Sequence, residues 1–276
     1  MQNENTNLMQ LKDIIALSIR DLTNGVNKTD NTICVIPDNH NIHSLEKHMS
    51  GRFRFRGTMD TKSTGDFAEY VKANSTKDES ACFIDQKSMS ASAVLNIGTV
   101  NKPGHADHIA KITLDKTAAY RAMLEITDQK LKQKTLAEFI EEYADNITAI
   151  DQEGQAMTPA AAAAAVRRIT IKAARDVESD SQQFAETRSA LEKIEAKSQG
   201  AMPAFLTFKC IPYHGVPERN FIMRLSILTS NDEPLLVLKT LKLEEHEEQM
   251  AEEFKELITL NLSGSGVDIY LGKFNS

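Results

Sequence analysis

The chain has 276 residues, of which 41% are hydrophobic and 26% are charged, and its formal net charge is -7. This composition excludes a wholly disordered chain, and the negative charge repels phosphate backbones, so nucleic-acid binding would need a local basic patch. The N-terminal sequence lacks the basic-then-apolar order of a secretion signal, and no apolar run approaches the roughly 18 residues of a membrane span. We therefore expect a cytoplasmic protein with no membrane partner.

The first third of the chain alternates between helical and extended patterns. Apolar residues at helical spacing predict an amphipathic helix over 8–22, and a compact apolar run predicts a buried strand over 32–36. A short helix is expected over 66–71, followed by strands over 81–84 and 90–95 that form a hairpin around a turn. The cysteines lie in apolar predicted strands, so we interpret them as buried reduced thiols: Cys34, Cys82 and Cys210.

Residues 104–150 give the clearest local pattern. A strand is expected over 109–114 because of its β-branched residues, and a helix should follow it. Asp115 and Thr117 can cap that helix, because their side-chain oxygens can accept from its first unpaired N–H groups. A second helix is expected to begin at Thr135, because Thr135 and Glu138 fit the reciprocal capping box. This stretch contains no nucleophile, phosphate-binding loop or metal quartet.

The most suggestive short segment alternates three arginines with two phenylalanines. As a strand, it would project the guanidinium groups from one face and the rings from the other. The arginines could contact phosphates or acidic partners, and exposed rings could stack on unpaired bases. The alternatives are a structural edge strand that carries cations to discourage aggregation and internal ion pairing of the arginines. The candidate nucleic-acid-binding residues are Arg52, Phe53, Arg54, Phe55 and Arg56.

Five histidines lie close together in sequence, in two groups. They do not show the spacing of four in a helix or two in a strand that would bring imidazoles onto one ion. We therefore favour surface or turn histidines over a metal site, with His108 hydrogen-bonded, and expect neither a metal nor a cofactor. The residues concerned are His40, His43, His48, His105 and His108.

Residues 151–200 differ in composition from the rest of the chain. Thr158 and Pro159 predict a helix start, and the alanines that follow favour a helix that reaches Val177, with a second helix beyond it. This alanine-rich arm or hairpin could pack against another copy of the chain or against its own body. The tentative oligomer contacts are Ala163, Val166, Ile169, Ala173 and Val177.

The C-terminal region returns to strands. An antiparallel meander is expected over 205–211, 220–229 and 235–238, followed by an acidic amphipathic helix over 243–260 and a last strand over 267–271. The predicted fold class is therefore α+β, with mixed, mainly antiparallel sheets, flanking helices and the alanine-rich arm or hairpin. We expect an N-terminal α+β region over 1–150, the arm over 151–200, and a region over 201–276 that packs with 1–150 as one domain.

The order of several segments resembles the YfdQ-like family of phage and prophage proteins. The segments that carry it are Gly57 onward with residues 66–71, residues 104–108 with 117–120, residues 137–142, Ile211-Pro212-Tyr213, and Arg224-Leu225. This resemblance implies an accessory protein of phage origin that acts inside a bacterium. The family has no assigned catalytic residues to transfer to this chain.

Three functions follow as hypotheses. The first is a non-enzymatic accessory protein that acts through self-assembly, as a homo-oligomer, and through macromolecular interaction. The second is a single-stranded nucleic-acid-binding protein of phage recombination, which would use Arg52, Arg54 and Arg56 with the neighbouring rings. The third is an inhibitor of a host defence protein, for which no residue indicates the target.

Overall fold

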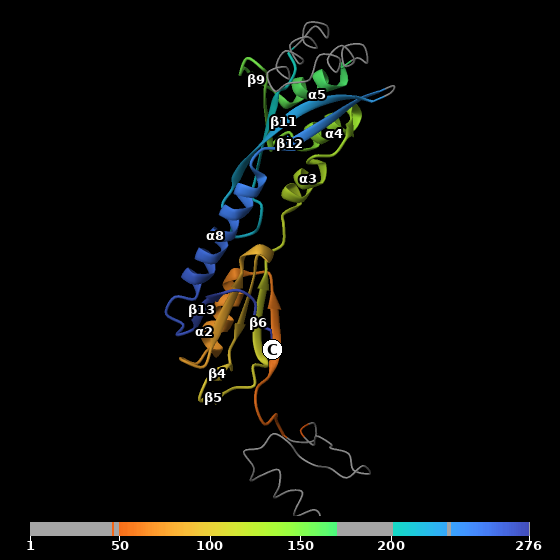
Figure 1. The fold of residues 1–276 in the computed structure, drawn as a ribbon. Helices are drawn as coiled ribbons and strands as arrows, with labels where there is room; N and C mark the ends of the chain where they lie inside the picture. The colour runs from red at the N-terminus through yellow and green to blue at the C-terminus, as the bar shows by residue number, and fades with distance from the viewer. Residues whose placement is uncertain (1–45, 47–49, 170–200, 231–232, 276) are drawn as a thin grey trace, which may run out of the picture. The chain divides into compact units, whose positions relative to one another are not determined.

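The computed structural model describes residues 46, 50–169, 201–230 and 233–275 (Figure 1). The chain divides into two compact units, Met1–Phe55 and Arg56–Ser276, and of the first unit only Glu46 and residues 50–55 are described. Several predictions therefore lie outside the described residues: the helix over 8–22, the strand over 32–36, Cys34, His40, His43, His48, Ala173, Val177 and the second arm helix.

The second unit contains a five-stranded sheet of mixed direction. Its strands, in sheet order, are β1 (Gly57–Thr61), β6 (His108–Thr113), β3 (Ser90–Val94), β2 (Ala81–Asp85) and β13 (Asp268–Leu271). The predicted hairpin is confirmed, because β2 and β3 pair antiparallel, as do β3 and β6. The two outer pairs are parallel: β1 with β6, and β13 with β2. A short ribbon, β4 (Gly98–Thr99) and β5 (Lys102–Pro103), lies between β3 and β6 in sequence.

One face of this sheet is packed and the other is more open. In β2, Cys82 and Ile84 are buried on the packed face, whereas Phe83 between them is only partly buried. Helix α2 (Thr64–Asn74) contacts β6 and β1 and contributes two side chains with no exposed area, Phe67 and Val71. The regularly spaced apolar side chains of α2 therefore pack in the core, as expected for the helix predicted over 66–71.

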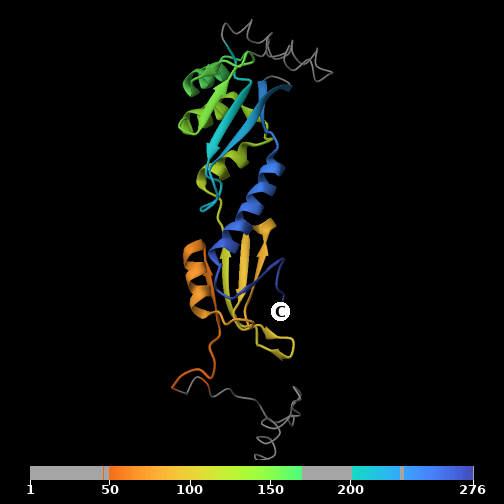
Figure 2. The same ribbon diagram turned by 90° about the vertical axis from the view of Figure 1, so that its left-hand side faces the viewer.

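The other sheet is antiparallel throughout. Its strands, in sheet order, are β7 (Leu131–Lys132), β12 (Glu233–Thr240), β11 (Arg219–Ser230), β10 (Phe205–Cys210), β8 (Ile147–Ile150) and β9 (Ala156–Met157). The predicted meander of β10, β11 and β12 is confirmed. Helices α3 (Ala118–Ile126), α4 (Gln133–Glu142) and α5 (Pro159–Arg167) pack on it, over a core that includes Phe208 and Phe221 (Figure 2).

The helix starts test the capping predictions. Thr117 accepts a hydrogen bond from the Tyr120 N–H at 3.3 Å, and Thr158 accepts one from the Ala161 N–H at 3.2 Å, so both caps are confirmed. The capping box at Thr135 is wrong: α4 begins at Gln133, with Lys132 as the N-terminal cap residue. The pairing of Lys132 with Leu235 of β12 fixes the chain there, and the helix starts directly after that pair.

Helix α8 (Leu243–Asn261) is the predicted acidic helix, and it contacts parts of the unit that are far apart in sequence. It buries Met250, Phe254 and Ile258 and contacts α2. The predicted turn after β2 is the short 3-10 helix η2 (Gln86–Ser88), whose Gln86 donates to the backbone oxygen of Ala251 at 3.4 Å. The fold is therefore α+β, with mixed, mainly antiparallel sheets and flanking helices, as the sequence predicts.

Candidate functional site

The predicted strand over 52–56 is not formed. Residues 50–56 are bends and irregular backbone, and the strand begins only at Gly57. A ladder needs a partner, and β6 supplies one no earlier than the point where the Gly57 N–H donates to Asp107 O at 2.9 Å. The segment therefore has no fixed division into an arginine face and a ring face.

Both aromatic rings of this segment are exposed. Phe53 is 87% exposed and Phe55 is 65% exposed, and the Phe53 N–H donates to Glu46 Oε1 at 3.1 Å. Arg52 and Arg56 are exposed and Arg54 is half-buried. The rings therefore do not face the core. The alternative that leaves only the arginines for a ligand does not apply.

The described members of the alanine-rich helix lie in the core of their own chain. Ala163 and Val166 have no exposed area and Ile169 is 5% exposed. Gln133 donates to the backbone oxygens of Val166 and Ile169, each at 2.8 Å, which holds the end of α5 against the start of α4. The expectation of one helix reaching Val177 is wrong, because α5 ends at Arg167. Contact of these residues with another copy stays a prediction.

The histidines of the 104–108 stretch separate in the structure. His105 is exposed, whereas His108 is 8% exposed, with Nε2 at 3.0 Å from the Tyr70 hydroxyl, so the predicted hydrogen bond is confirmed. Burial lowers the pKa of His108, and the charge of Asp107 partly opposes that shift. Within the described ranges, no group of three His, Cys, Asp or Glu side chains could hold a metal ion.

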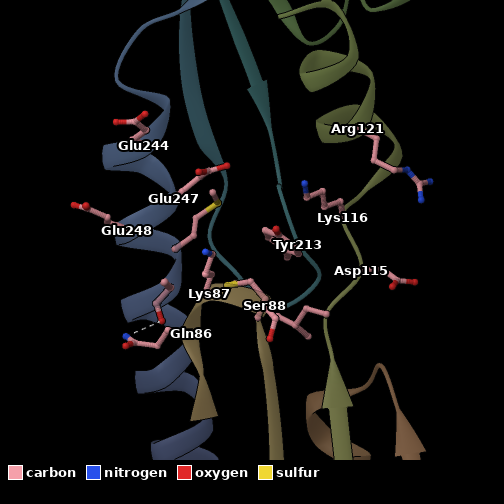
Figure 3. A pocket seen from close by; sticks show the side chains of 14 residues that line it. Gln86, Lys87, Ser88, Asp115, Lys116, Arg121, Tyr213, Glu244, Glu247 and Glu248 are labelled. Carbon is pink, nitrogen blue, oxygen red and sulfur yellow. Dashed lines mark hydrogen bonds between the residues drawn. The ribbon is translucent and has the colours of Figure 1, made fainter. Parts of the chain in front are cut away.

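The second unit contains a cavity of about 950 Å³ that no sequence pattern indicated (Figure 3). Four segments that are far apart in sequence line it: η2 with Met89, the loop and first turn of α3, the loop between β10 and β11, and α8. The lining residues are Gln86, Lys87, Ser88, Met89, Leu114, Asp115, Lys116, Arg121, Tyr213, Glu244, Glu247, Glu248, Met250 and Ala251.

The cavity carries opposite charges on opposite walls. Lys87 and Lys116 point into the space around Tyr213, and Glu247 points into it from α8, whereas Glu248 and Asp115 point away (Figure 3). The Lys116 ammonium also lies 5.8 Å from the ring centre of Tyr120. On the acidic helix α8, Glu248 therefore points away from the cavity, whereas the exposed Glu247 faces it.

Burial and neighbouring groups shift the pKa values of Tyr213 in this cavity and of Asp85 beside it. Burial, and then the charge of Glu247, raise the pKa of Tyr213, so this hydroxyl is a donor and not a base at neutral pH. The Ser88 hydroxyl donates to Asp85, and this hydrogen bond, with Lys273, lowers the pKa of Asp85 and makes it a poor base for activating Ser88. The arrangement presents both positive and negative groups to a ligand.

The two described cysteines, Cys82 and Cys210, are not reactive groups in this fold. Cys82 and Cys210 are free and buried, which confirms the prediction for these two. Burial raises the pKa of Cys82 to about 12 and that of Cys210 to about 11, so neither is a thiolate at neutral pH. We therefore find no activated thiol among the described residues.

The described residues define an α+β protein with two main sheets. A family model described as uncharacterized conserved protein, DUF2303, matches residues 4–274, and the chain belongs to this family. No curated protein and no solved structure matches the chain significantly. None of the helices in the described ranges has the length and apolar character needed to cross a bilayer.

Proposed function

We propose that the protein acts without catalysis, by binding single-stranded nucleic acid through the segment Arg52–Arg56. The observation that carries this proposal is the exposure of Phe53 and Phe55, at 87% and 65%. Exposed rings beside guanidinium groups are the combination that single-strand-binding proteins use, because bases stack on the rings and cations contact the phosphates. The interpretation of Arg52–Arg56 as a nucleic-acid-binding segment therefore remains, although the predicted strand is not formed.

The local positive charge of this segment supports nucleic-acid binding, although the net charge of the whole chain opposes it. The formal net charge of -7 opposes polyanion binding at long range, whereas three arginines within five residues form a local basic segment. Binding should therefore be strongly sensitive to salt. The resemblance to YfdQ-like phage and prophage proteins would fit such a role in phage recombination inside a bacterial cell.

Self-assembly through the alanine-rich helix has less support than this binding role. The three described candidate contacts, Ala163, Val166 and Ile169, are buried in their own chain and would have to leave the core to meet a second copy. Inhibition of a host defence protein is favoured by no described residue. We therefore put single-strand binding first.

Titration of a labelled oligothymidylate, followed by fluorescence anisotropy at several salt concentrations, tests the proposal. Changing Arg52, Arg54 and Arg56 together to Ala should weaken binding and reduce the salt slope by about 2, since each phosphate contact on a single strand contributes about 0.7. Changing Phe53 and Phe55 to Ala should weaken binding at least tenfold, because each stacked base is worth about 1–3 kcal/mol.

A matched control separates the segment from net charge. Changing the exposed residues Lys77, Lys102 and Lys134 to Ala removes the same number of positive charges from the second unit, and it should leave most of the affinity intact. Binding that is equally weak in both triple variants would show only a general charge effect. The absence of any salt-sensitive binding by the unaltered protein would overturn the proposal outright.

A further inference from the structure

Strand β13 is an outer strand of the five-stranded sheet, and among the described residues only its side toward β2 is paired. It pairs in parallel with β2, and the Asp268 and Gly272 N–H groups donate to Ser80 and Ile84 at 3.3 Å and 2.9 Å. In a parallel ladder alternate residues bond to the same neighbour, so the backbone groups of Ile269 and Leu271 point outward. No strand in the described part of the chain pairs with that outer side.

Two large apolar side chains of β13 are exposed, and they lie on opposite faces of the sheet. Tyr270 is 52% exposed and stacks on Phe83, with ring centres 5.7 Å apart, on the open face. Leu271 is 58% exposed, and its register partner is Ile84, which is buried on the packed face. A ligand lying on either face would cover one of the two. An additional strand along the edge contacts both.

The sequence of β13 does not protect this edge. Natural edge strands often carry Lys, Pro or a bulge that prevents pairing with another chain, and Asp-Ile-Tyr-Leu contains none of these residues. The opposite edge strand of the same sheet, β1, exposes no large apolar side chain. Of the two edge strands of this sheet, β13 is therefore the one that exposes large apolar side chains.

We propose that a second copy of this chain pairs antiparallel with β13 across a two-fold axis at Tyr270. The outward backbone groups of Ile269 and Leu271 in one copy then meet those of Leu271 and Ile269 in the other. The contact is isologous, so it closes after two copies. It joins two five-stranded sheets into one.

The side chains of this edge are compatible with that symmetry. Phe274 and Tyr270 both pack against Phe83, with ring centres 5.1 Å and 5.7 Å from it, and pairing at Tyr270 extends this row of rings into the other copy. Ile269 of one copy covers Leu271 of the other on the packed side. Asp268 of one copy comes opposite Gly272 of the other, beside Lys273, whose ammonium lies 3.0 Å from Asp85 Oδ2 of its own copy.

This inference stands apart from nucleic-acid binding, because it uses none of the residues 52–56. Sedimentation velocity of the full chain over a wide concentration range should show a concentration-dependent dimer, since a pair of short strands is a small interface. Leu271→Lys should abolish the dimer, whereas Thr58→Lys, on exposed β1, should leave it unchanged. Leu271→Pro removes the outward N–H together with the leucine side chain and should also give a monomer.

A cysteine pair tests the register. Tyr270→Cys puts two cysteines opposite each other in a non-hydrogen-bonded pair, with Cα atoms about 4.5 Å apart, within the range of a disulfide. Mild oxidation should give a covalent dimer of this variant, and Asp268→Cys on the same strand should give little. A strictly monomeric unaltered protein, a dimer that survives both Leu271 variants with their folded structure intact, or equal cross-linking at the two positions would each overturn the proposal.

Discussion

Arg219 of β11 and Glu253 of α8 form an ion pair that joins the antiparallel sheet to α8, with Nη2 at 2.5 Å from Oε1. Arg219 also donates from Nη1 to Gln249 at 2.9 Å, and its side chain is only 10% exposed. The position of α8 against this sheet therefore depends on a cation with little access to water. Removing its anionic partner should leave that charge poorly compensated.

We expect Glu253→Gln to lower the free energy of unfolding by about 2 kcal/mol, somewhat less than for a fully buried pair because Glu253 is partly exposed. Urea denaturation measures the change. The exposed pair Lys134–Glu138 is the control, and Glu138→Gln should change stability by less than about 1 kcal/mol. Equal, small effects at both sites would contradict the structural role given to Arg219.

Stability should fall as the pH drops through the histidine range. The pKa of His108 is lower in the folded state than in the unfolded chain, so between the two values the unfolded state binds more protons and is favoured as pH falls. Urea midpoints at about pH 7.5 and about pH 5.5 span the unfolded histidine pKa of about 6.5. His108→Gln should reduce the difference between them.

A second substitution tests the cause of that pH dependence from the opposite direction. The negative charge of Asp107 raises the pKa of His108 and so opposes the effect of burial. Asp107→Asn should therefore make stability fall more steeply between the same two pH values. A pH dependence unchanged by either substitution would mean that other groups control stability in this range.

The helix caps give a prediction with opposite signs at two threonines. Thr158→Ala removes the hydroxyl that caps α5 and should destabilise the protein by about 1 kcal/mol. Thr135 fits a capping motif in sequence but lies exposed inside α4, so Thr135→Ala should be neutral or slightly stabilising because alanine has the higher helix propensity. Thermal unfolding of the two variants should therefore shift the midpoint in different directions.

The packing of α5 distinguishes core from surface on a single helix. Ala163 has no exposed area, so Ala163→Leu should overpack the core and reduce stability by about 1–3 kcal/mol. Ala164→Leu places the same side chain on the exposed face of α5 and should change stability little. Destabilisation measured by urea, without a change of mass in solution, would support the core role. A changed oligomer with unchanged stability would favour the interface role instead.

Local patterns predicted most elements, and non-local pairing accounts for the failures. The meander, the hairpin of β2 and β3, and α8 follow from apolar periodicity and turn residues that are neighbours in sequence. The alternation over 52–56 has the same form, but it does not meet a ladder partner before Gly57. A strand pattern is sufficient only where another strand is present to pair with it.

The candidate sites show the same limit. The alternation over 52–56 does not predict that Phe53 and Phe55 are exposed. It assigns side chains to two faces, but it does not show which face the rest of the fold covers. The cavity was missed because its residues come from four separate segments and form no local motif. The acidic sequence around Glu247 predicts an amphipathic helix, but helical spacing alone does not distinguish the carboxylate that faces the cavity from the outward ones.

Because β13 pairs in parallel with β2, the five-stranded sheet cannot be completed until β13 has been synthesised. The ribosome delivers β2 early and β13 after every other described element, with the whole antiparallel sheet between them. Until residues 268–271 emerge, β2 is itself an outer strand, and Phe83 lacks the rings of Tyr270 and Phe274. A nascent or truncated chain would therefore present a different open edge from the finished protein, and would be the form most prone to premature association.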